Sequence, residues 1–153
     1  MNFFSHCKKC SANQICGNWH VYVIEYKKDV LNETKFKKRN SHVLDPHENK
    51  CYYVGITKDH NPECRYKQHV RKRTKKRKSH IICRCKGNDK KLELTPYNGS
   101  GKFVQKYHKP NGLRAEIYRH LNPLKASTRK EAEAIEKKLA KDLIKNGHAV
   151  WFN

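Results

Sequence analysis

The hydrophobic residues of this chain gather in short clusters, and two clusters have the pattern of β-strands. Residues 20–26, HVYVIEY, carry apolar side chains on both faces, which predicts a central strand. Residues 51–57, CYYVGIT, predict a second strand, along which alternation places Tyr53 and Gly55 on the same face. These two patterns predict a β-sheet at the centre of the fold.

Two helices have recognisable ends. The run Asn61-Pro62-Glu63 combines a capping residue, a proline at the first helical position and an acid in the first turn, and it predicts a helix reaching to about Lys72. A longer helix begins with the capping box of Thr128 and Glu131 and ends at Asn146-Gly147.

Weaker patterns predict the remaining elements. They are an extended polar connection over residues 27–49, a β-hairpin over residues 81–95, short helices over residues 103–107 and 113–121, and a final strand over residues 149–152. No repeat or linker divides the chain. The order of elements predicts one small α/β (α+β) domain over residues 20–153, preceded by a Cys-rich segment over residues 1–19.

Composition restricts the class of protein. The 153 residues include only 36% hydrophobic residues, with a mean hydropathy of −1.05, so the core is expected to be lean. No apolar stretch approaches the roughly 20 residues of a membrane helix, and the start of the chain has no export-signal pattern. We therefore expect an intracellular, cytoplasmic protein. The net charge of +21 indicates a polyanionic partner, most simply nucleic acid.

The positive charge is concentrated in one run, RKRTKKRK. Such a run is often a solvated flexible loop, but this one directly follows the predicted helix at residues 61–72, which favours contact with nucleic-acid phosphates. The candidate nucleic-acid contacts are Lys58, Arg71, Lys72, Arg73, Lys75, Lys76, Arg77 and Lys78.

The seven cysteines are an odd number without an export signal, which argues against a disulfide framework. Cys7, Cys10 and Cys16 have the spacing of a zinc knuckle. The fourth ligand could be His20, His6 or a more distant residue, and plain reduced thiols are the alternative to zinc. Cys83 and Cys85 share one strand face and could contribute metal ligands, although packing is the favoured interpretation. Cys51 and Cys64 are expected to be small buried hydrophobes.

Glu136 is the most informative acid. On a helical wheel it falls within the apolar stripe of the last helix, which is formed by Ala132, Ile135, Leu139 and Leu143. A carboxylate facing the core is costly unless it is paired or bound to a cation. An ion pair with a buried arginine and a metal-binding carboxylate are both consistent with this position.

Each of the remaining candidate catalytic residues, taken alone, has a position that is common in proteins without a catalytic role. Arg65 and His69 lie four residues apart on one helix face, and Tyr22 and Tyr53 each lie in a strand. Their order, followed by Glu136 on a late helix, resembles the GIY-YIG nuclease family over residues 20–153. The two naming tripeptides of that family correspond here to His20-Val21-Tyr22 and Tyr53-Val54-Gly55.

The sequence departs from the family pattern at three places. His20 stands where the first glycine is expected, the connection over residues 27–49 is longer than the usual hairpin, and a second insertion spans about residues 71–98. Both insertions fall between elements, where variation is tolerated. The resemblance implies a three-stranded antiparallel central sheet flanked by helices.

The resemblance also implies a site. Glu136 would hold one Mg²⁺ or Mn²⁺ ion against a substrate phosphate, and Tyr22 would be the general base, its pKa lowered by the metal and nearby cations. Arg65 would neutralise developing charge, Tyr53 and His69 would position the reacting groups, and Gly55 would leave room for the nucleic-acid backbone.

The sequence thus predicts a metal-dependent endonuclease that cuts DNA as a monomer or homodimer. Two alternatives stay open. One is a non-catalytic nucleic-acid-binding protein stapled by zinc, and the other is a nuclease directed at RNA.

Overall fold

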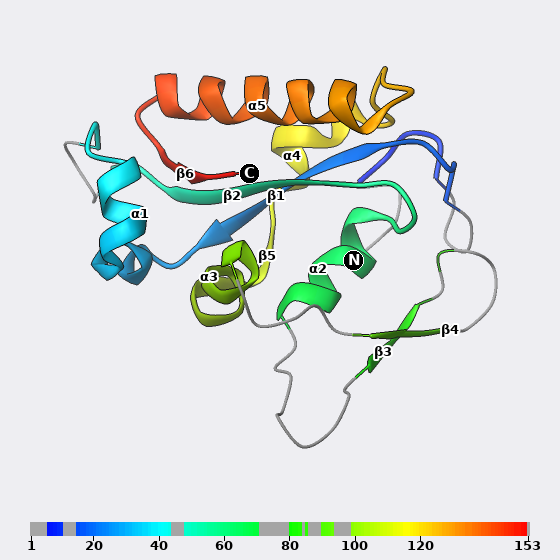
Figure 1. The fold of residues 1–153 in the computed structure, drawn as a ribbon, viewed down its shortest axis with the longest axis horizontal. Coiled ribbons are helices and arrows are strands. Elements are labelled where there is room, and N and C mark those ends of the chain that lie inside the picture. Colours follow the sequence, from blue (N-terminus) through cyan, green and yellow to red (C-terminus); the bar gives the residue numbers. More distant parts are fainter. Residues whose placement is uncertain are drawn as a thin grey trace.

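A computed structural model describes residues 6–10, 15–43, 48–70, 80–83, 85, 90–93 and 99–152. Its centre is a four-stranded mixed sheet with helices on both faces (Figure 1). The strand order is β5-β1-β2-β6. β1 (His20–Tyr26) pairs along its whole length with antiparallel β2 (Cys51–Thr57), as the two strongest strand patterns predict.

The outer strands differ from the expected three-stranded antiparallel arrangement. β6 (Ala149–Trp151) runs parallel to β2, and β5 (His108–Leu113) adds a fourth strand antiparallel to β1. The sequence of β5, HKPNGL, has no strand pattern, since proline and Asn-Gly are typical of turns. An edge position tolerates these residues because only one side of the strand must pair.

A buried ion-pair cluster joins β5 to β1. Glu25 of β1 is only 3% exposed, accepts a hydrogen bond from Arg114 Nε at 3.0 Å and forms an ion pair with Lys109. Burial raises the pKa of Glu25, but Lys109 and Arg114 outweigh this effect and hold it below its ordinary value. These two cationic partners of Glu25 lie in or directly after β5, the strand that the sequence pattern does not predict.

Helices cover the two faces of the sheet. In Figure 1, α5 (Arg129–Lys145) runs along one face, while α2 (Pro62–Val70) and α3 (Gly99–Tyr107) lie on the other. The predicted ends of α5 are confirmed, since the Thr128 side chain accepts a hydrogen bond from the Glu131 N–H at 3.2 Å and Gly147 has φ +92°. The predicted end of α2 near Lys72 lies outside the described residues.

The connection between β1 and β2, described except at residues 44–47, is largely helical in its first half rather than extended. It contains the 3₁₀ helix η2 (Lys28–Asn32) and α1 (Thr34–Arg39), which bury Val30 and Phe36 completely. These two apolar anchors are six residues apart in an otherwise polar segment, which is too sparse a pattern to reveal a helix.

Residues 113–121 do not form the single helix expected there. After β5 ends at Leu113, the chain forms α4 (Ala115–Tyr118) and the 3₁₀ helix η3 (Arg119–Leu121). Tyr118 is the fully buried anchor of this segment.

The predicted hairpin is present as a separate two-stranded sheet. β3 (His80–Cys83) pairs with antiparallel β4 (Lys90–Glu93), and its expected turn at residues 87–89 lies outside the described residues. β3 ends at Cys83 and Cys85 follows in a turn, so these two cysteines do not share a strand face. Within the described ranges, no helix combines the length and apolar character needed to cross a bilayer.

Candidate active site

A small cavity of about 180 Å³ brings together four of the five predicted catalytic residues. The residues lining it come from β1, β2, α2 and α5, and they are Tyr22, Tyr53, Ile56, Arg65, Arg129, Glu133 and Glu136. Positions far apart in the sequence therefore converge at one place, where the two central strands meet the helices of both layers.

His69, the fifth predicted residue, joins the site through Tyr22. The Tyr22 hydroxyl and His69 Nε2 are 3.1 Å apart, and both side chains are buried. Burial, with a smaller effect of Arg65, lowers the pKa of His69 from 6.5 to about 3. His69 is therefore a neutral imidazole at pH 7 that shares a hydrogen bond with the Tyr22 hydroxyl.

The pKa of Tyr22 moves in the opposite direction from the sequence expectation. Burial raises it well above 10, Tyr53 adds to this effect, and Arg65 opposes it without overcoming it. The lowering expected from nearby cations is absent in the protein alone, because the Tyr22 ring is only 1% exposed and desolvation outweighs one guanidinium.

Gly55 makes room for Tyr22 rather than for a ligand. The two residues are directly opposite each other in the β1–β2 ladder. A Cβ atom built on Gly55 would lie 2.7 Å from both the Tyr22 hydroxyl oxygen and the ring carbon that bears it. The space that was expected to accommodate nucleic acid is therefore filled by the tyrosine ring.

Glu136 lies in the most buried stripe of α5, as predicted. It is 2% exposed, in line with the buried Ala132, Ala140 and Leu143, whereas Ile135 is only half-buried. The buried stripe is thus centred closer to Glu136 than the sequence indicates.

Two further residues of α5 line the cavity. Arg129 Nε donates to Glu133 Oε1 at 2.9 Å, and both side chains are largely exposed. With Glu136 they follow an i, i+4, i+7 spacing on one helix face, which was the available sequence signal for their position.

The N-terminal cysteines and His20 form a compact cluster. The ligand atoms of Cys7, Cys10, Cys16 and His20 all lie within 4.8 Å of one another. Cys7 and Cys16 sulfurs are 4.0 Å apart, and His20 Nε2 is 3.4 Å from the sulfurs of both Cys10 and Cys16. A tetrahedral zinc site has S–S edges of about 3.8 Å and S–N edges of about 3.6 Å, so this cluster could hold such an ion.

His20 ties this cluster to the cavity. It is the first residue of β1, two positions before Tyr22, and is completely buried. Burial lowers the pKa of His20 to about 4, so the imidazole is neutral and available as a ligand at pH 7. The residue that replaces the expected glycine thus anchors the Cys-rich segment to the strand carrying Tyr22. His6, the other candidate fourth ligand, instead contacts Tyr118 through its Nδ1 at 2.6 Å.

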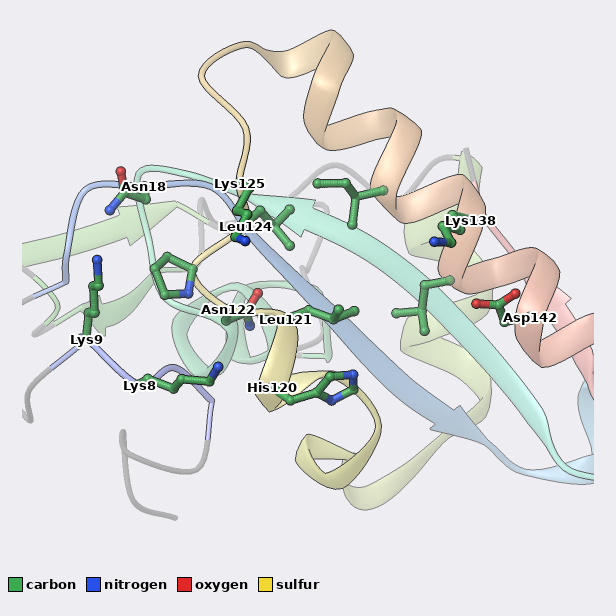
Figure 2. A pocket seen from close by; sticks show the side chains of 13 residues that line it. Lys8, Lys9, Asn18, His120, Leu121, Asn122, Leu124, Lys125, Lys138 and Asp142 are labelled. Carbon is green, nitrogen blue, oxygen red and sulfur yellow. The ribbon is translucent and has the colours of Figure 1, made fainter.

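A larger cavity of about 770 Å³ shares no lining residue with the first. Figure 2 shows Lys8 and Lys9 of the N-terminal segment on one side of it and Lys138 and Asp142 of α5 on the other. Its lining combines four lysines, one of them on α5, with apolar side chains of α5 and of the segment that precedes it.

The predicted nucleic-acid contacts are only partly described. Residues 71–79 lie outside the described residues, and with them the whole run from Arg71 to Lys78. Lys58 is exposed, with its ammonium nitrogen 5.8 Å from the centre of the Trp19 ring.

No family model, curated protein sequence or solved structure matches this chain. The assignment of function therefore depends on the chemistry of the cavity and of the cysteine clusters.

Proposed function

We propose that this protein is a divalent-metal-dependent endonuclease of the GIY-YIG type that hydrolyses phosphodiester bonds in DNA. The observation that carries the proposal is the 180 Å³ cavity lined by Tyr22, Tyr53, Arg65 and Glu136. These are the residues singled out by the family resemblance, and they reach the cavity from two strands and two helices.

The donor set fits a single hard cation that retains waters. Mg²⁺ binds proteins through one or two carboxylates together with substrate phosphates, and Glu136 offers one buried carboxylate at the cavity. When bound, the ion would act as a Lewis acid that stabilises charge on the phosphate. Arg65, which also lines the cavity, would neutralise further charge through its planar guanidinium.

The Tyr22–His69 pair is suited to orienting a hydroxyl. Because the pKa of Tyr22 is raised, a free tyrosinate is a poor description of the base in the protein alone. The neutral His69, whose Nε2 lies 3.1 Å from the Tyr22 oxygen, would hold that hydroxyl toward the attacking water rather than take up its proton, since the pKa of His69 is about 3. Tyr53, which stacks at an angle against Tyr22 with ring centres 6.1 Å apart, would hold the Tyr22 ring in place.

DNA is the proposed substrate because the charge of +21 matches a polyanion and because lysines surround the larger cavity beside α5. The basic run from Arg71 to Lys78 would add contacts without sequence preference. A Zn²⁺ ion in the Cys7–Cys10–Cys16–His20 cluster would fix the N-terminal segment against β1.

A non-catalytic nucleic-acid-binding protein is the second candidate, since the charge and the cysteines serve it equally well. It explains a buried carboxylate beside an arginine only as a structural ion pair, and it gives no reason for the two tyrosines at the same cavity. Nuclease activity and nucleic-acid binding must therefore be measured on the same variants.

The test is nicking of supercoiled plasmid and cleavage of single-stranded DNA and RNA, with Mg²⁺, Mn²⁺ or EDTA. We expect metal-dependent cleavage of DNA by the wild type and a loss of at least about 100-fold in Tyr22→Phe, the usual order for general acid–base groups. Tyr26→Phe is the matched control, since it lies on the same strand and, within the described residues, its buried hydroxyl has no hydrogen-bond partner. A pure protein that binds DNA but cuts nothing with either metal would contradict the proposal.

A further inference from the structure

A second group of thiols and an imidazole converges at the start of α2. His60 lies in the turn before the helix, Cys64 in its first turn, Cys83 at the end of β3 and Cys85 in the following turn. The ligand atoms of His60, Cys83 and Cys85 all lie within 4.8 Å of one another, and the Cys64 and Cys85 sulfurs are 2.9 Å apart. We propose that these residues form a second zinc site, with the ligand set His60, Cys64, Cys83 and Cys85.

The donor set is one that zinc prefers. Three thiolates and one imidazole form a common four-coordinate structural site, and the three cysteines are at most 5% exposed. His60 Nδ1 lies 3.1 Å from the Cys83 sulfur. A tetrahedral ion needs edges of about 3.6–3.8 Å, so the His60–Cys83 and Cys64–Cys85 pairs would each have to separate by less than about 1 Å. The Cys64 sulfur lies outside the group of three that is mutually within 4.8 Å, so it would also have to move closer to the rest of that group.

The backbone around the group also favours thiolate. The Asn61 N–H donates to the Cys85 sulfur at 3.4 Å, as the Lys9 N–H donates to the Cys7 sulfur at 3.4 Å in the N-terminal cluster. Such bonds stabilise a metal-bound sulfur and orient it. Both clusters thus share a ligand set of three cysteines and one histidine and a backbone donor to sulfur.

A disulfide between Cys64 and Cys85 is the competing arrangement. Their separation of 2.9 Å exceeds the roughly 2.05 Å of a disulfide bond, and both are free thiols here. A disulfide would also leave Cys83 and His60 facing each other without a function for either. Zinc accounts for all four side chains.

The proposed ion would attach the β3–β4 hairpin to the helix that carries Arg65 and His69. An isolated two-stranded hairpin is marginal in water, so a covalent or metal link at its base has a clear structural benefit. Cys64 immediately precedes Arg65, and the basic run lies between Cys64 and Cys83 in sequence. The site would thus close the base of the basic insertion and fix the start of α2.

The two clusters are also joined to each other. The Ile15 N–H, between the cysteines of the first cluster, donates to the Cys85 carbonyl at 2.7 Å, and the Ile15 side chain packs on Cys64, Cys83 and Cys85. The N-terminal segment and the hairpin therefore share one interface.

The test is the zinc content of the purified full-length protein, measured by inductively coupled plasma mass spectrometry. We expect two zinc ions per chain in the wild type and one in Cys85→Ser. The matched control is Cys51→Ser, since Cys51 is buried but belongs to neither cluster, and we expect it to retain two ions. The zinc count does not depend on nuclease activity. The second zinc site can therefore be disproved while the proposed nuclease function holds, and the nuclease function can be disproved while the zinc site holds.

Cobalt substitution keeps the test valid if Cys85→Ser does not fold. In the wild type, thiolate-to-cobalt absorption should rise until two equivalents of Co²⁺ are bound. In Cys16→Ser, which disables the first cluster, it should saturate at one equivalent. Saturation of the wild type at one equivalent, an unchanged zinc count in Cys85→Ser, or a Cys64–Cys85 disulfide found by mass spectrometry of the alkylated protein would each overturn the proposal.

Discussion

Gly55 and Tyr22 form a mutually dependent pair. The Tyr22 ring fills the space above the glycine, where a Cβ would lie 2.7 Å from ring carbon and hydroxyl. We expect Gly55→Ala to lower the free energy of unfolding by about 1–3 kcal/mol, the usual cost of overpacking, and to abolish cleavage by displacing the Tyr22 hydroxyl.

A double-mutant cycle checks this explanation by urea unfolding. In a Tyr22→Ala background the alanine at position 55 loses both 2.7 Å contacts and meets only Tyr53 Cε1 at 3.0 Å, so its cost should fall. Equal costs in the two backgrounds would show that Gly55 is required for a reason other than the Tyr22 ring.

His69 makes the stability of the protein depend on pH. Its pKa is lowered from 6.5 to about 3 in the folded state, so between these values the unfolded chain binds a proton that the folded chain does not. Stability must therefore fall as the pH falls from 6.5, by up to about 1.4 kcal/mol per pH unit from this residue.

Replacing His69 by glutamine removes that contribution while retaining hydrogen-bonding capacity. We expect His69→Gln to be less stable than the wild type at pH 7 and to lose less stability between pH 6.5 and 4.5. Urea unfolding at the two pH values gives the difference. Parallel losses in the two proteins would mean that His69 is not held neutral by burial.

Asn122 links three segments at the scale of the elements. It accepts a hydrogen bond from the Val21 N–H at 2.9 Å and donates to the carbonyls of Val21 at 2.9 Å and His6 at 2.8 Å. It thereby fixes the beginning of β1, next to His20, to the Cys-rich segment and to the residues after η3.

Asn122→Ala should lower the free energy of unfolding by about 2–4 kcal/mol, because it leaves buried backbone groups without partners. Asn32→Ala on η2, which is exposed, should change it by less than about 0.5 kcal/mol. Thermal or urea unfolding distinguishes the two. Similar small effects would mean that the three hydrogen bonds of Asn122 are readily replaced by water.

The elements that the sequence predicts well are those whose signals are local. The Thr128 capping box, the apolar run of β1, the alternation in β2 and the Asn61-Pro62 helix start all depend on neighbouring residues. β5 has no local strand signal. Its turn-like sequence is held in the sheet by its edge position and by the ion pairs of Lys109 and Arg114 with Glu25. The helices η2 and α1 likewise depend on tertiary burial of Val30 and Phe36.

The candidate site shows the same division. The burial of Glu136 follows from helix periodicity, whereas the grouping of the cavity residues is expected only from the resemblance to a known family. The raised pKa of Tyr22 and the filling of the space above Gly55 require knowledge of the register between β1 and β2. The grouping of His60 and Cys64 with Cys83 and Cys85 requires the position of the hairpin, since the spacings H-x3-C and C-x-C are not zinc-knuckle signals by themselves.

At the scale of the whole molecule, the lysine-lined cavity and the cavity that contains Glu136 are separate, with no lining residue in common. The net charge of +21 attracts any polyanion at long range, and lysines line the cavity on one side of α5. The other cavity on the same helix contains Glu136, a buried carboxylate. Binding and cleavage should therefore be separable by substitution, which a protein that only binds nucleic acid would not permit.

Glu136→Gln provides the most direct test of the account, because it keeps the shape of the side chain and removes only its charge. We predict that the variant binds DNA with a Kd within about threefold of the wild type, while single-turnover plasmid nicking with Mg²⁺ slows by at least about 100-fold, a loss comparable to removing one electrostatic stabiliser of a transition state. Asp142→Asn, on the same helix but lining the other cavity, should nick at the wild-type rate. Undiminished nicking by Glu136→Gln would contradict the central claim that this carboxylate holds the catalytic metal.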